Sequence, residues 1–333
     1  MNKTECVLAG RVDIGRHYIL SGGVQGRKEP YEDQVARLLS FGRYMFDYRE
    51  YPIVAELFHS EIFQSAAKSV CPKDKQVLDP FQFNFIGQLP GQTVALHVDG
   101  VYFWGATRFQ FPQWLLAVMQ FSGLFQKEYV DQIQVVAYFH QWNATEQIGG
   151  EFVYWDVNQD IPKKQLPLSR AGSIVDGSKV IHAATVYQPD KKAPKLDKSA
   201  QNILSYVSDD RWTLSSNGKV IGEYVTDDIR WTIVYRARCF ASEAEVKHFN
   251  NLPENEVMKL DEILNKLAND LIARGKLDKS FKLEEADKLD FAIKLLDEYI
   301  KYPLSPYAAI PYNYCALGKL QPWLNPLLSL ICK

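Results

Sequence analysis

The feature that most constrains the fold is a succession of short segments rich in aromatic and β-branched residues, which runs from about residue 79 to residue 241 and is punctuated by turn residues. The segments are FQFNFIG, TVALHVD, QVVAYFHQW, EFVYWDV, GSIVDG, KVIHAATVY, NILSYVSD, GEYVTD and RWTIVYRARCF. Many short strands with few helices between them are typical of an antiparallel sandwich or barrel. We therefore predict a mainly β fold with α additions.

Helical patterns flank this β region. Apolar residues recur at helical spacing over 31–70, which predicts two helices, and a further helical stretch over about 111–132 interrupts the strands. Amphipathic helices are expected between 242 and 300, after a serine N-cap at Ser242. The predicted organisation is an N-terminal helical flank over 1–78, a catalytic β core over 79–241 and a C-terminal helical extension over 242–333.

The amino-acid composition and the net charge argue against some classes of binding partner. With 47% hydrophobic residues among 333, the chain can bury a large core. The 38 basic and 40 acidic residues leave a net charge of −2, so no global field would attract nucleic acid or an anionic membrane. We expect a small-molecule substrate, with no nucleic acid, no membrane and no obligatory protein partner.

The cysteine pattern and the hydropathy of the sequence predict the cellular compartment. The five cysteines are widely scattered and form no CxxC pair, which predicts reduced thiols (Cys6, Cys71, Cys239, Cys315 and Cys332). The first residues lack the pattern of a signal peptide, and no segment approaches about 18 uninterrupted apolar residues. The expectation is a cytoplasmic protein.

A metal-ligand pattern lies inside the β region. His97 and Asp99 are two positions apart at the end of the strand TVALHVD, so period-two alternation points both side chains to one face. His182, in the strand KVIHAATVY, could complete a set of two imidazoles and one carboxylate. Such a set leaves coordination positions open, which suits iron(II). The alternative is that this short pattern occurs by chance and that the histidines are core residues.

The order of the surrounding motifs strengthens the metal interpretation. A Pro90-Gly91 turn precedes HVD, a Gly149-Gly150-Glu151 turn follows it, and the strand AGSIVDG leads to His182 before RWTIVYRARCF. Residues of about 80–240 thereby resemble the Fe(II)/2-oxoglutarate-dependent dioxygenase superfamily, with its HxD…H…R signature. The resemblance implies a double-stranded β-helix (jelly roll) core and a catalytic iron held by His97, Asp99 and His182. It also implies 2-oxoglutarate and dioxygen as co-substrates.

The resemblance further implies residues that bind 2-oxoglutarate. Arg230 matches the arginine of the last core strand, and Thr232 resembles its hydroxyl partner, although Arg236 and Arg238 share the same face. His182 and Arg230 are 48 positions apart, so residues of about 188–228 must form an insertion with strands of its own. The usual tyrosine before HxD has no counterpart. Asn84 or Gln82 could replace it, or could form structural hydrogen bonds only.

The substrate is suggested by a narrower likeness. HVDGVYFWGATRF and the long helical extension look like the algal kainoid synthases of secondary metabolite biosynthesis. This implies oxidative cyclisation of an amino-acid-derived substrate that bears carboxylates, with hydroxylation as the broader alternative. The candidate substrate residues are Tyr102, Trp104, Arg108, Tyr138 and Arg236, with Lys179 as a further carboxylate partner. The aromatic members could equally belong to the core, and Arg108 could lie on a solvated turn.

Two functions from other classes remain open at this stage. A cupin-like metal-dependent isomerase or hydrolase could use the same three ligands without the terminal arginine. A non-catalytic β-sandwich binding module would need neither the ligands nor the metal.

Overall fold

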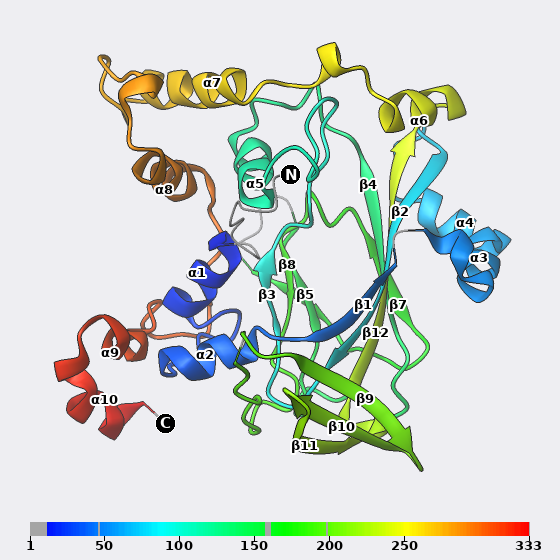
Figure 1. The fold of residues 1–333 in the computed structure, drawn as a ribbon, viewed down its shortest axis with the longest axis vertical. Helices are drawn as coiled ribbons and strands as arrows, with labels where there is room; N and C mark the ends of the chain where they lie inside the picture. The colour runs from blue at the N-terminus through cyan, green and yellow to red at the C-terminus, as the bar shows by residue number, and fades with distance from the viewer. Residues whose placement is uncertain (1–11, 46, 157–160, 198, 333) are drawn as a thin grey trace.

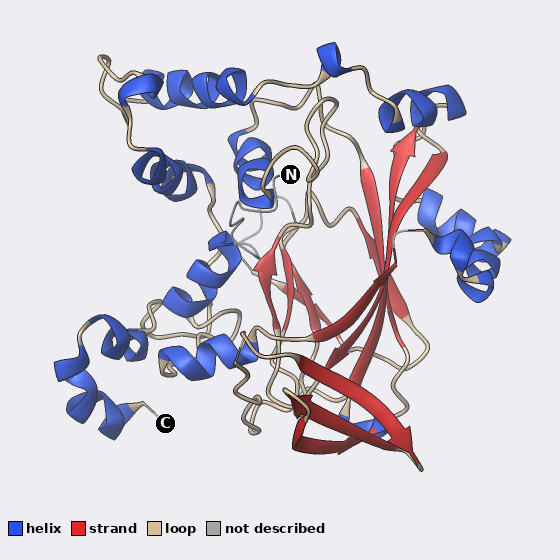
Figure 2. Ribbon diagram, in the orientation of Figure 1, coloured by secondary structure: helices blue, strands red, loops and turns tan. Residues whose placement is uncertain are grey.

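The computed structural model describes residues 12–45, 47–156, 161–197 and 199–332. Antiparallel sheets occupy the centre of the molecule, and helices surround them (Figure 1). Figure 2 shows that most helices lie on one side of the sheets and at the top, with one helical pair on the opposite side. The mainly β architecture with antiparallel sheets and helical additions, as predicted from the sequence, is confirmed.

The large sheet has five strands in the order β1-β2-β12-β4-β7. They are β1 (Phe41–Met45), β2 (Val77–Gln88), β12 (Arg230–Phe240), β4 (Gln132–Tyr138) and β7 (Gly172–Val175). One face packs on α3 (Pro52–His59) and α4 (Glu61–Lys68) through buried residues such as Phe83, Ile133 and Tyr235. Because side chains alternate along a strand, the neighbours of these residues point to the opposite face.

The small sheet has four strands in the order β3-β8-β5-β6. They are β3 (Val94–His97), β8 (His182–Ala184), β5 (Phe152–Tyr154) and β6 (Lys163–Gln165). Its outer side contributes Leu96 and Val153 to a buried cluster with Val24 and Tyr302. A cavity between the two sheets is lined by residues from both, so the two sheets face one another.

A third sheet lies within the segment predicted as an insertion. It consists of β9 (Asn202–Ser208), β10 (Arg211–Ser216) and β11 (Lys219–Val225), in the order β11-β10-β9. Leu214 packs with Leu89 and Ile229 at the end of the large sheet where β2 finishes and β12 begins. The third sheet thus covers one end of the cavity-bearing sandwich without pairing with its strands in the described residues.

The largest apolar cluster joins three helices outside the sheets. They are α5 (Gln113–Ser122), α7 (Leu260–Ala273) and α8 (Lys288–Tyr299), which bury Leu116, Leu267 and Leu295 among others. The remaining α-helices are α1 (Val12–Ser21), α2 (Tyr31–Arg37), α6 (Glu243–Asn250), α9 (Leu317–Leu320) and α10 (Asn325–Ile331). Ser242 caps α6 by accepting a hydrogen bond from the Glu245 backbone N–H, as the sequence predicts.

One part of the N-terminal flank corrects the sequence prediction. Residues 41–45, expected in a helix, form the edge strand β1, which pairs with residues 83–87 of β2. The backbone groups at the open edge of β2 bond to this segment, so a tertiary pairing outweighs a weak local helical pattern. Helical structure resumes with a short 3-10 helix, η1 (Tyr48–Glu50), and then α3.

The cysteines also correct the prediction. Cys71 pairs with Cys239 and Cys315 pairs with Cys332, while Cys6 lies outside the described residues. The first pair is 168 residues apart in sequence, so only the fold brings the two thiols together. Disulfides are typical of oxidising compartments, so the cysteines no longer support the expectation of a cytoplasmic protein. No helix in the described ranges is long and apolar enough to cross a bilayer.

Candidate metal centre

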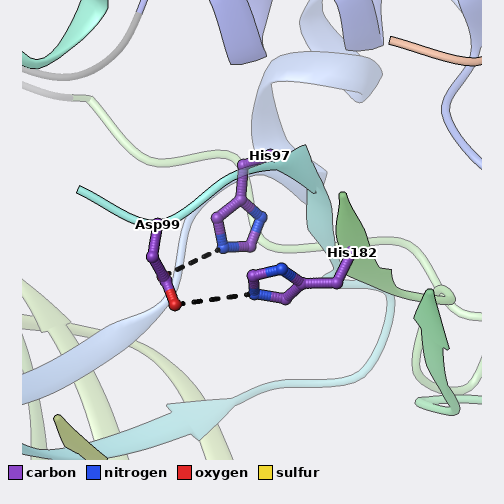
Figure 3. A group of neighbouring side chains, drawn as sticks. All are labelled: His97, Asp99 and His182. Carbon is purple, nitrogen blue, oxygen red and sulfur yellow. Dashed lines mark ion pairs between the residues drawn. The ribbon is translucent and has the colours of Figure 1, made fainter. Parts of the chain in front are cut away.

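Three predicted ligands meet at the edge of the small sheet. His97 ends β3, His182 begins β8, and the two are cross-strand partners with ring centroids 4.2 Å apart. Asp99 follows His97 by two positions and turns its carboxylate toward both rings (Figure 3). Its Oδ1 lies 3.7 Å from His97 Nε2, and its Oδ2 lies 3.9 Å from His182 Nε2. The candidate ligand atoms all lie within 4.8 Å of one another.

Backbone carbonyls fix the tautomers of the two histidines. His97 Nδ1 lies 2.8 Å from the Ala95 carbonyl oxygen, and His182 Nδ1 lies 2.8 Å from the Val180 carbonyl oxygen. Because a carbonyl can only accept, each Nδ1 carries a hydrogen, and each Nε2 faces Asp99. Burial lowers the pKa of His182 to about 4, which keeps this imidazole neutral at pH 7. Both rings are therefore oriented as metal ligands.

Asp99 supplies the anionic ligand. Burial opposes its ionisation, but the Arg236 guanidinium and the two histidines hold the pKa of the carboxyl well below its usual range. Its buried Oδ2 has no hydrogen-bond partner among the described residues, and Arg236 Nε lies 3.9 Å away. A buried carboxylate oxygen without a donor is costly unless a cation takes the place of the donor. Two imidazoles and one carboxylate therefore fit an iron(II) ion.

A glycine makes room for this carboxylate. Gly177 accepts a hydrogen bond from the Asp99 backbone N–H at 2.7 Å through its carbonyl oxygen. A Cβ atom at position 177 would lie 2.0 Å from Asp99 Oδ2, which is far inside van der Waals contact. The approach of the turn to the carboxylate therefore requires glycine.

The three ligands open into a cavity of about 330 Å³ between the two sheets. The large sheet contributes alternating residues of three strands, which are Gln82, Asn84, Ile86 and Gln88 of β2, Gln134 and Val136 of β4, and Arg230, Thr232, Val234 and Arg236 of β12. The small sheet contributes Phe152, Ala183 and Ala184 beside the histidines. A cavity of this volume is large enough for one or two small molecules.

Arg230 is a buried cation in the wall of this cavity. Its side chain donates to the Gly150 carbonyl oxygen at 3.1 Å, to Gln88 Oε1 at 2.5 Å and to Thr232 Oγ1 at 2.9 Å. Its guanidinium also lies over the Tyr138 ring, 5.0 Å from the centroid. Only 3% of the residue is exposed, and it forms no ion pair in the described part of the chain. A buried charge without a counterion is expensive, so this end of the cavity is suited to an anion.

Other predicted residues also line the cavity. Gln82 accepts a hydrogen bond from Arg108 at 2.9 Å, and the Asn84 Oδ1 atom is buried without a partner among the residues described. Arg236 donates to the Gly100 carbonyl oxygen at 2.8 Å and to Gln132 at 3.1 Å. The structure thus brings all of the predicted cofactor-binding residues, together with Arg108 and Arg236, to the cavity that holds the candidate ligands.

Several of the predicted substrate residues lie away from this cavity. Tyr102 and Trp104 pack in an aromatic cluster with Phe240 and Phe249, because the loop after Asp99 turns outward toward α6. Tyr138 lies beneath the Arg230 guanidinium and not among the residues that line the cavity.

Two other basic residues that the sequence suggested for ligand binding, Arg238 and Lys179, form ion pairs with aspartates. Arg238 pairs with Asp79 at 2.5 Å, so it is not an alternative to Arg230. Lys179 pairs with Asp131 at 2.5 Å and with Asp176 at 3.5 Å, outside the residues that line the cavity. Neither of these two cations lines the cavity.

Four residues of the site were missed by the sequence analysis. Gln134 donates to His182 Nε2 at 3.2 Å, a contact that a bound metal would replace, and Gln88 and Gln113 line the cavity. Gly177 supports Asp99. The alternation of QIQVV could have suggested Gln134, since a glutamine flanked by apolar residues in a buried strand needs a polar partner. No local signal identifies the others.

Comparisons with known proteins give remote likenesses. Neither a protein-family model nor a curated protein sequence matches the chain. Among solved structures, an oxidoreductase of the 2OG-Fe(II) oxygenase family from Burkholderia pseudomallei is 10% identical, with 56% of this chain and 55% of that chain covered and a TM-score of 0.31. This chain thus spans about half the length of that protein.

Two further structures show similar values. A prolyl-4-hydroxylase from Pseudomonas putida is 10% identical over 61% of this chain and 74% of that chain, with a TM-score of 0.32. HygX from Streptomyces hygroscopicus, with nickel and 2-oxoglutarate bound, is 8% identical over 62% and 73%, also with a TM-score of 0.32. Likenesses at this level are too remote to assign an activity, so the function below is argued from the residues of this chain.

Proposed function

We propose that this protein is an Fe(II)/2-oxoglutarate-dependent oxygenase. The proposal is carried by one cavity whose wall contains both the three candidate ligands and Arg230. The ligands are His97, Asp99 and His182. Arg230 is buried and forms no ion pair with any described residue. Three protein ligands leave positions for a chelating co-substrate and dioxygen, and the guanidinium suits the far carboxylate of 2-oxoglutarate. An arginine of this kind has no role in a simple metal hydrolase.

The strand order supports a double-stranded β-helix. When β2, β3, β4, β5, β6, β7, β8 and β12 are numbered one to eight, the large sheet reads 1-8-3-6 after the edge strand β1, and the small sheet reads 2-7-4-5. Successive strands therefore alternate between the two sheets, except that strands four and five are neighbours in the small sheet, as in a jelly roll. In that arrangement the metal ligands come from strands two and seven, and the arginine comes from the start of strand eight.

The roles of the residues follow from their contacts. His97, Asp99 and His182 would hold an iron(II) ion, which would supply a binding position for 2-oxoglutarate and the activation of dioxygen for oxidation of a substrate C–H bond. Arg230 would bind the far carboxylate of 2-oxoglutarate, with Thr232 and Gln88 holding the guanidinium in place. The buried walls of both sheets would exclude water from the reacting atoms.

The substrate is proposed to be small and anionic. Arg236 and Arg108 line the cavity in addition to Arg230, and Asp99 is the only carboxylate among its described lining residues. Two arginines beyond the one assigned to 2-oxoglutarate favour a carboxylate-bearing, amino-acid-derived substrate. Oxidative cyclisation, as in a kainoid synthase, and hydroxylation are both consistent with this substrate class. Product mass separates them, because cyclisation removes two hydrogens and hydroxylation adds one oxygen.

The test is a turnover assay with iron(II), 2-oxoglutarate and dioxygen, in which succinate is quantified with and without a panel of acidic amino-acid derivatives. The proposal predicts succinate formation that is increased by at least one derivative and abolished by His97→Ala. A cupin-like isomerase or hydrolase would transform its substrate without consuming 2-oxoglutarate. A non-catalytic binding module would bind ligands equally well with or without iron.

A further inference from the structure

The turn formed by residues 176–180 contacts two of the three candidate metal ligands. The Gly177 carbonyl oxygen accepts a hydrogen bond from the Asp99 backbone N–H at 2.7 Å. The Val180 carbonyl oxygen lies 2.8 Å from His182 Nδ1. Any displacement of this turn would therefore move both Asp99 and the His182 ring.

The turn is closed by its own first residue. The Asp176 carbonyl oxygen accepts from the backbone N–H groups of Lys179 at 3.1 Å and Val180 at 3.0 Å. The Asp176 carboxylate accepts from the Ser178 backbone N–H at 3.1 Å and from its hydroxyl at 2.6 Å. Tyr129, whose hydroxyl lies 3.3 Å from both carboxylate oxygens, also contacts the Ser178 hydroxyl. These bonds give the turn its shape, and Tyr129 links the Asp176 and Ser178 side chains to a segment outside the turn.

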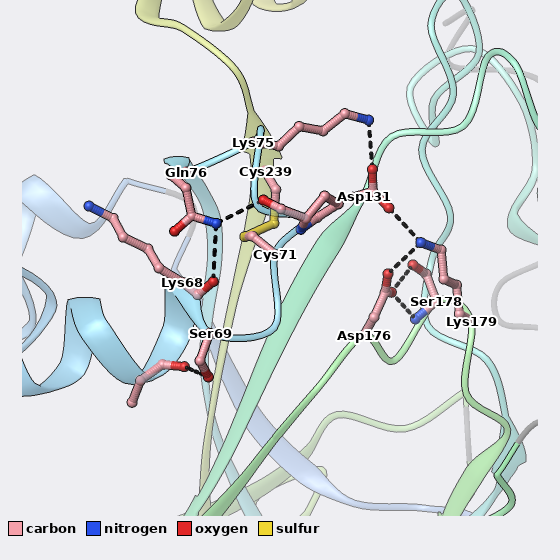
Figure 4. The surroundings of a disulfide bond; sticks show 12 residues. Lys68, Ser69, Cys71, Lys75, Gln76, Asp131, Asp176, Ser178, Lys179 and Cys239 are labelled. Carbon is pink, nitrogen blue, oxygen red and sulfur yellow. Dashed lines mark hydrogen bonds and ion pairs between the residues drawn. A yellow bond between two sulfur atoms is a disulfide. The ribbon is translucent and has the colours of Figure 1, made fainter.

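Lys179 provides the link to the large sheet. Its Nζ atom lies 2.5 Å from Asp131 Oδ1 and 3.5 Å from Asp176 Oδ2 (Figure 4). The same atom lies 4.7 Å from the centre of the Tyr129 ring. Asp131 directly precedes β4, the strand whose Gln134 contacts His182. The ammonium group thus bridges one carboxylate on the turn and one carboxylate at the start of β4.

Asp131 is itself held firmly in place. Its Oδ2 pairs with Lys75 at 2.7 Å, and its carbonyl oxygen accepts from the Cys239 backbone N–H at 2.8 Å. Cys239 is joined to Cys71 by a disulfide, as Figure 4 shows. The start of β4 is therefore a fixed point against which Lys179 can position the turn.

We propose that Lys179 is a positioning residue for the metal centre. Its bridge between Asp131 and Asp176 holds the 176–180 turn against β4 and thereby keeps Asp99 and His182 in the geometry that binds the metal. The inference rests on the proposed metal site. It also replaces the expectation that Lys179 binds a substrate carboxylate. Without the ammonium group, the two carboxylates would repel one another and the turn would move away from β4.

The test compares metal binding by the full-length wild type and Lys179→Met. Dissociation constants are measured anaerobically for iron(II), and cobalt(II) is used as a spectroscopic probe of the ligand geometry. Lys179→Met should bind either metal about 10- to 100-fold more weakly, as is typical when a partner of a metal ligand is removed. The visible cobalt spectrum should also change, which a purely structural loss of stability would not cause. Lys179→Arg, which keeps the bridging charge, should restore most of the affinity.

Lys75→Met is the matched control. Lys75 pairs with the same Asp131 carboxylate, and among the described contacts it has no hydrogen bond or ion pair with the 176–180 turn. It should therefore leave the metal affinity within about threefold of the wild type, well inside the range of a lost outer contact. If Lys179→Met does not fold, Asp131→Asn removes the same ion pair with little change in shape and should weaken binding to a similar degree.

The outcomes separate the two proposals. A wild type that binds no metal contradicts the proposed function itself. A wild type that binds metal, together with folded Lys179→Met or Asp131→Asn variants of unchanged affinity and cobalt spectrum, overturns the positioning role and leaves the proposed function intact.

Discussion

Gly177 lies so close to Asp99 that a Cβ atom at position 177 would be 2.0 Å from the carboxylate Oδ2 and 3.1 Å from His182 Cε1. The Gly177→Ala variant should therefore displace the carboxylate from its position between the two histidines. We expect the affinity for iron(II) to fall by about 100-fold, the upper end of the range for perturbed partners of metal ligands. Equilibrium dialysis under anaerobic conditions measures this loss.

Gly15→Ala is the control for that substitution. Gly15 lies in α1, and nothing lies within 4 Å of the position that its Cβ would take. Alanine is a better helix former than glycine, so this variant should be stabilised by up to about 1 kcal/mol and bind metal normally. Equal metal affinity of Gly177→Ala and the wild type would show that Asp99 is not a ligand in the geometry described.

Arg230 should govern the binding of 2-oxoglutarate without governing the binding of metal. Arg230→Met removes the buried guanidinium but leaves His97, Asp99 and His182 untouched. The affinity of the iron-loaded protein for 2-oxoglutarate should fall by about 100-fold, as expected for loss of one partner of a buried charge pair. Isothermal titration calorimetry on the anaerobic iron complex measures it.

Arg238→Met provides the comparison for Arg230. Arg238 pairs with Asp79 and packs against Phe81 and Phe249, away from the cavity. This variant should lower the free energy of unfolding, because it leaves Asp79 buried without its cation. Its affinity for 2-oxoglutarate should stay near that of the wild type. If Arg238→Met instead weakened 2-oxoglutarate binding more than Arg230→Met does, Arg238 and not Arg230 would be the residue that binds the co-substrate.

The stability of the fold should depend on pH through His140. Burial lowers its pKa from the ordinary 6.5 to about 4 in the folded protein, where its Nε2–H donates to the Pro167 carbonyl oxygen. Between these two values the unfolded chain binds a proton and the folded chain does not. The contribution of His140 to the free energy of unfolding therefore falls as the pH drops from 6.5 toward 4, by about 2 kcal/mol at pH 5.

The measurement is denaturant unfolding at pH 7.5 and pH 5 for the wild type and His140→Phe. Phenylalanine can keep the stacking on Trp142, whose ring lies 3.6 Å away, but it cannot take up a proton. The variant should therefore lose about 2 kcal/mol less stability between the two pH values than the wild type does. An identical loss in both proteins would refute the assignment of a neutral buried His140.

The disulfide between Cys71 and Cys239 should stabilise the body of the protein. It closes a loop of 168 residues, and the chain-entropy model predicts about 5 kcal/mol for a loop of this length. Replacing both cysteines by alanine should lower the free energy of unfolding by that amount. The Cys315→Ala/Cys332→Ala pair, which opens a separation of only 17 residues, should cost less. Thermal unfolding under matched conditions compares the two pairs, and a larger loss in the second pair would contradict this ranking.

The β architecture and the three candidate ligands were predictable because both depend on local periodicity. The alternation of TVALHVD places His97 and Asp99 on one side of the chain, and the strand around His182 is recognisable from its own residues. The pairing of His97 with His182 across β3 and β8 could not be derived, since strand partners are set by the whole topology. The strand over 41–45 was missed for the same reason.

The surroundings of the ligands were less predictable. Tyr102 and Trp104 looked suitable for a pocket because they follow HVD closely, but the chain turns away from the cavity after Asp99. The three arginines that the sequence places on one face of β12 have different partners in the structure. Arg238 forms an ion pair with Asp79, and Arg236 donates a hydrogen bond to the Gly100 carbonyl oxygen. Arg230 forms hydrogen bonds but no ion pair with a carboxylate in the described residues. These partners come from distant segments, which periodicity does not reveal.

The most direct test of the central claim is an anaerobic titration of the protein with iron(II) followed by 2-oxoglutarate, monitored by visible absorption. An Fe(II)/2-oxoglutarate-dependent oxygenase should bind one iron per chain and should develop a weak charge-transfer band that forms only when 2-oxoglutarate is added and saturates at one equivalent. His97→Ala should abolish the band, and Arg230→Met should shift its formation to much higher 2-oxoglutarate concentrations. Stoichiometric iron binding without any such band would contradict the assignment as a 2-oxoglutarate-dependent oxygenase.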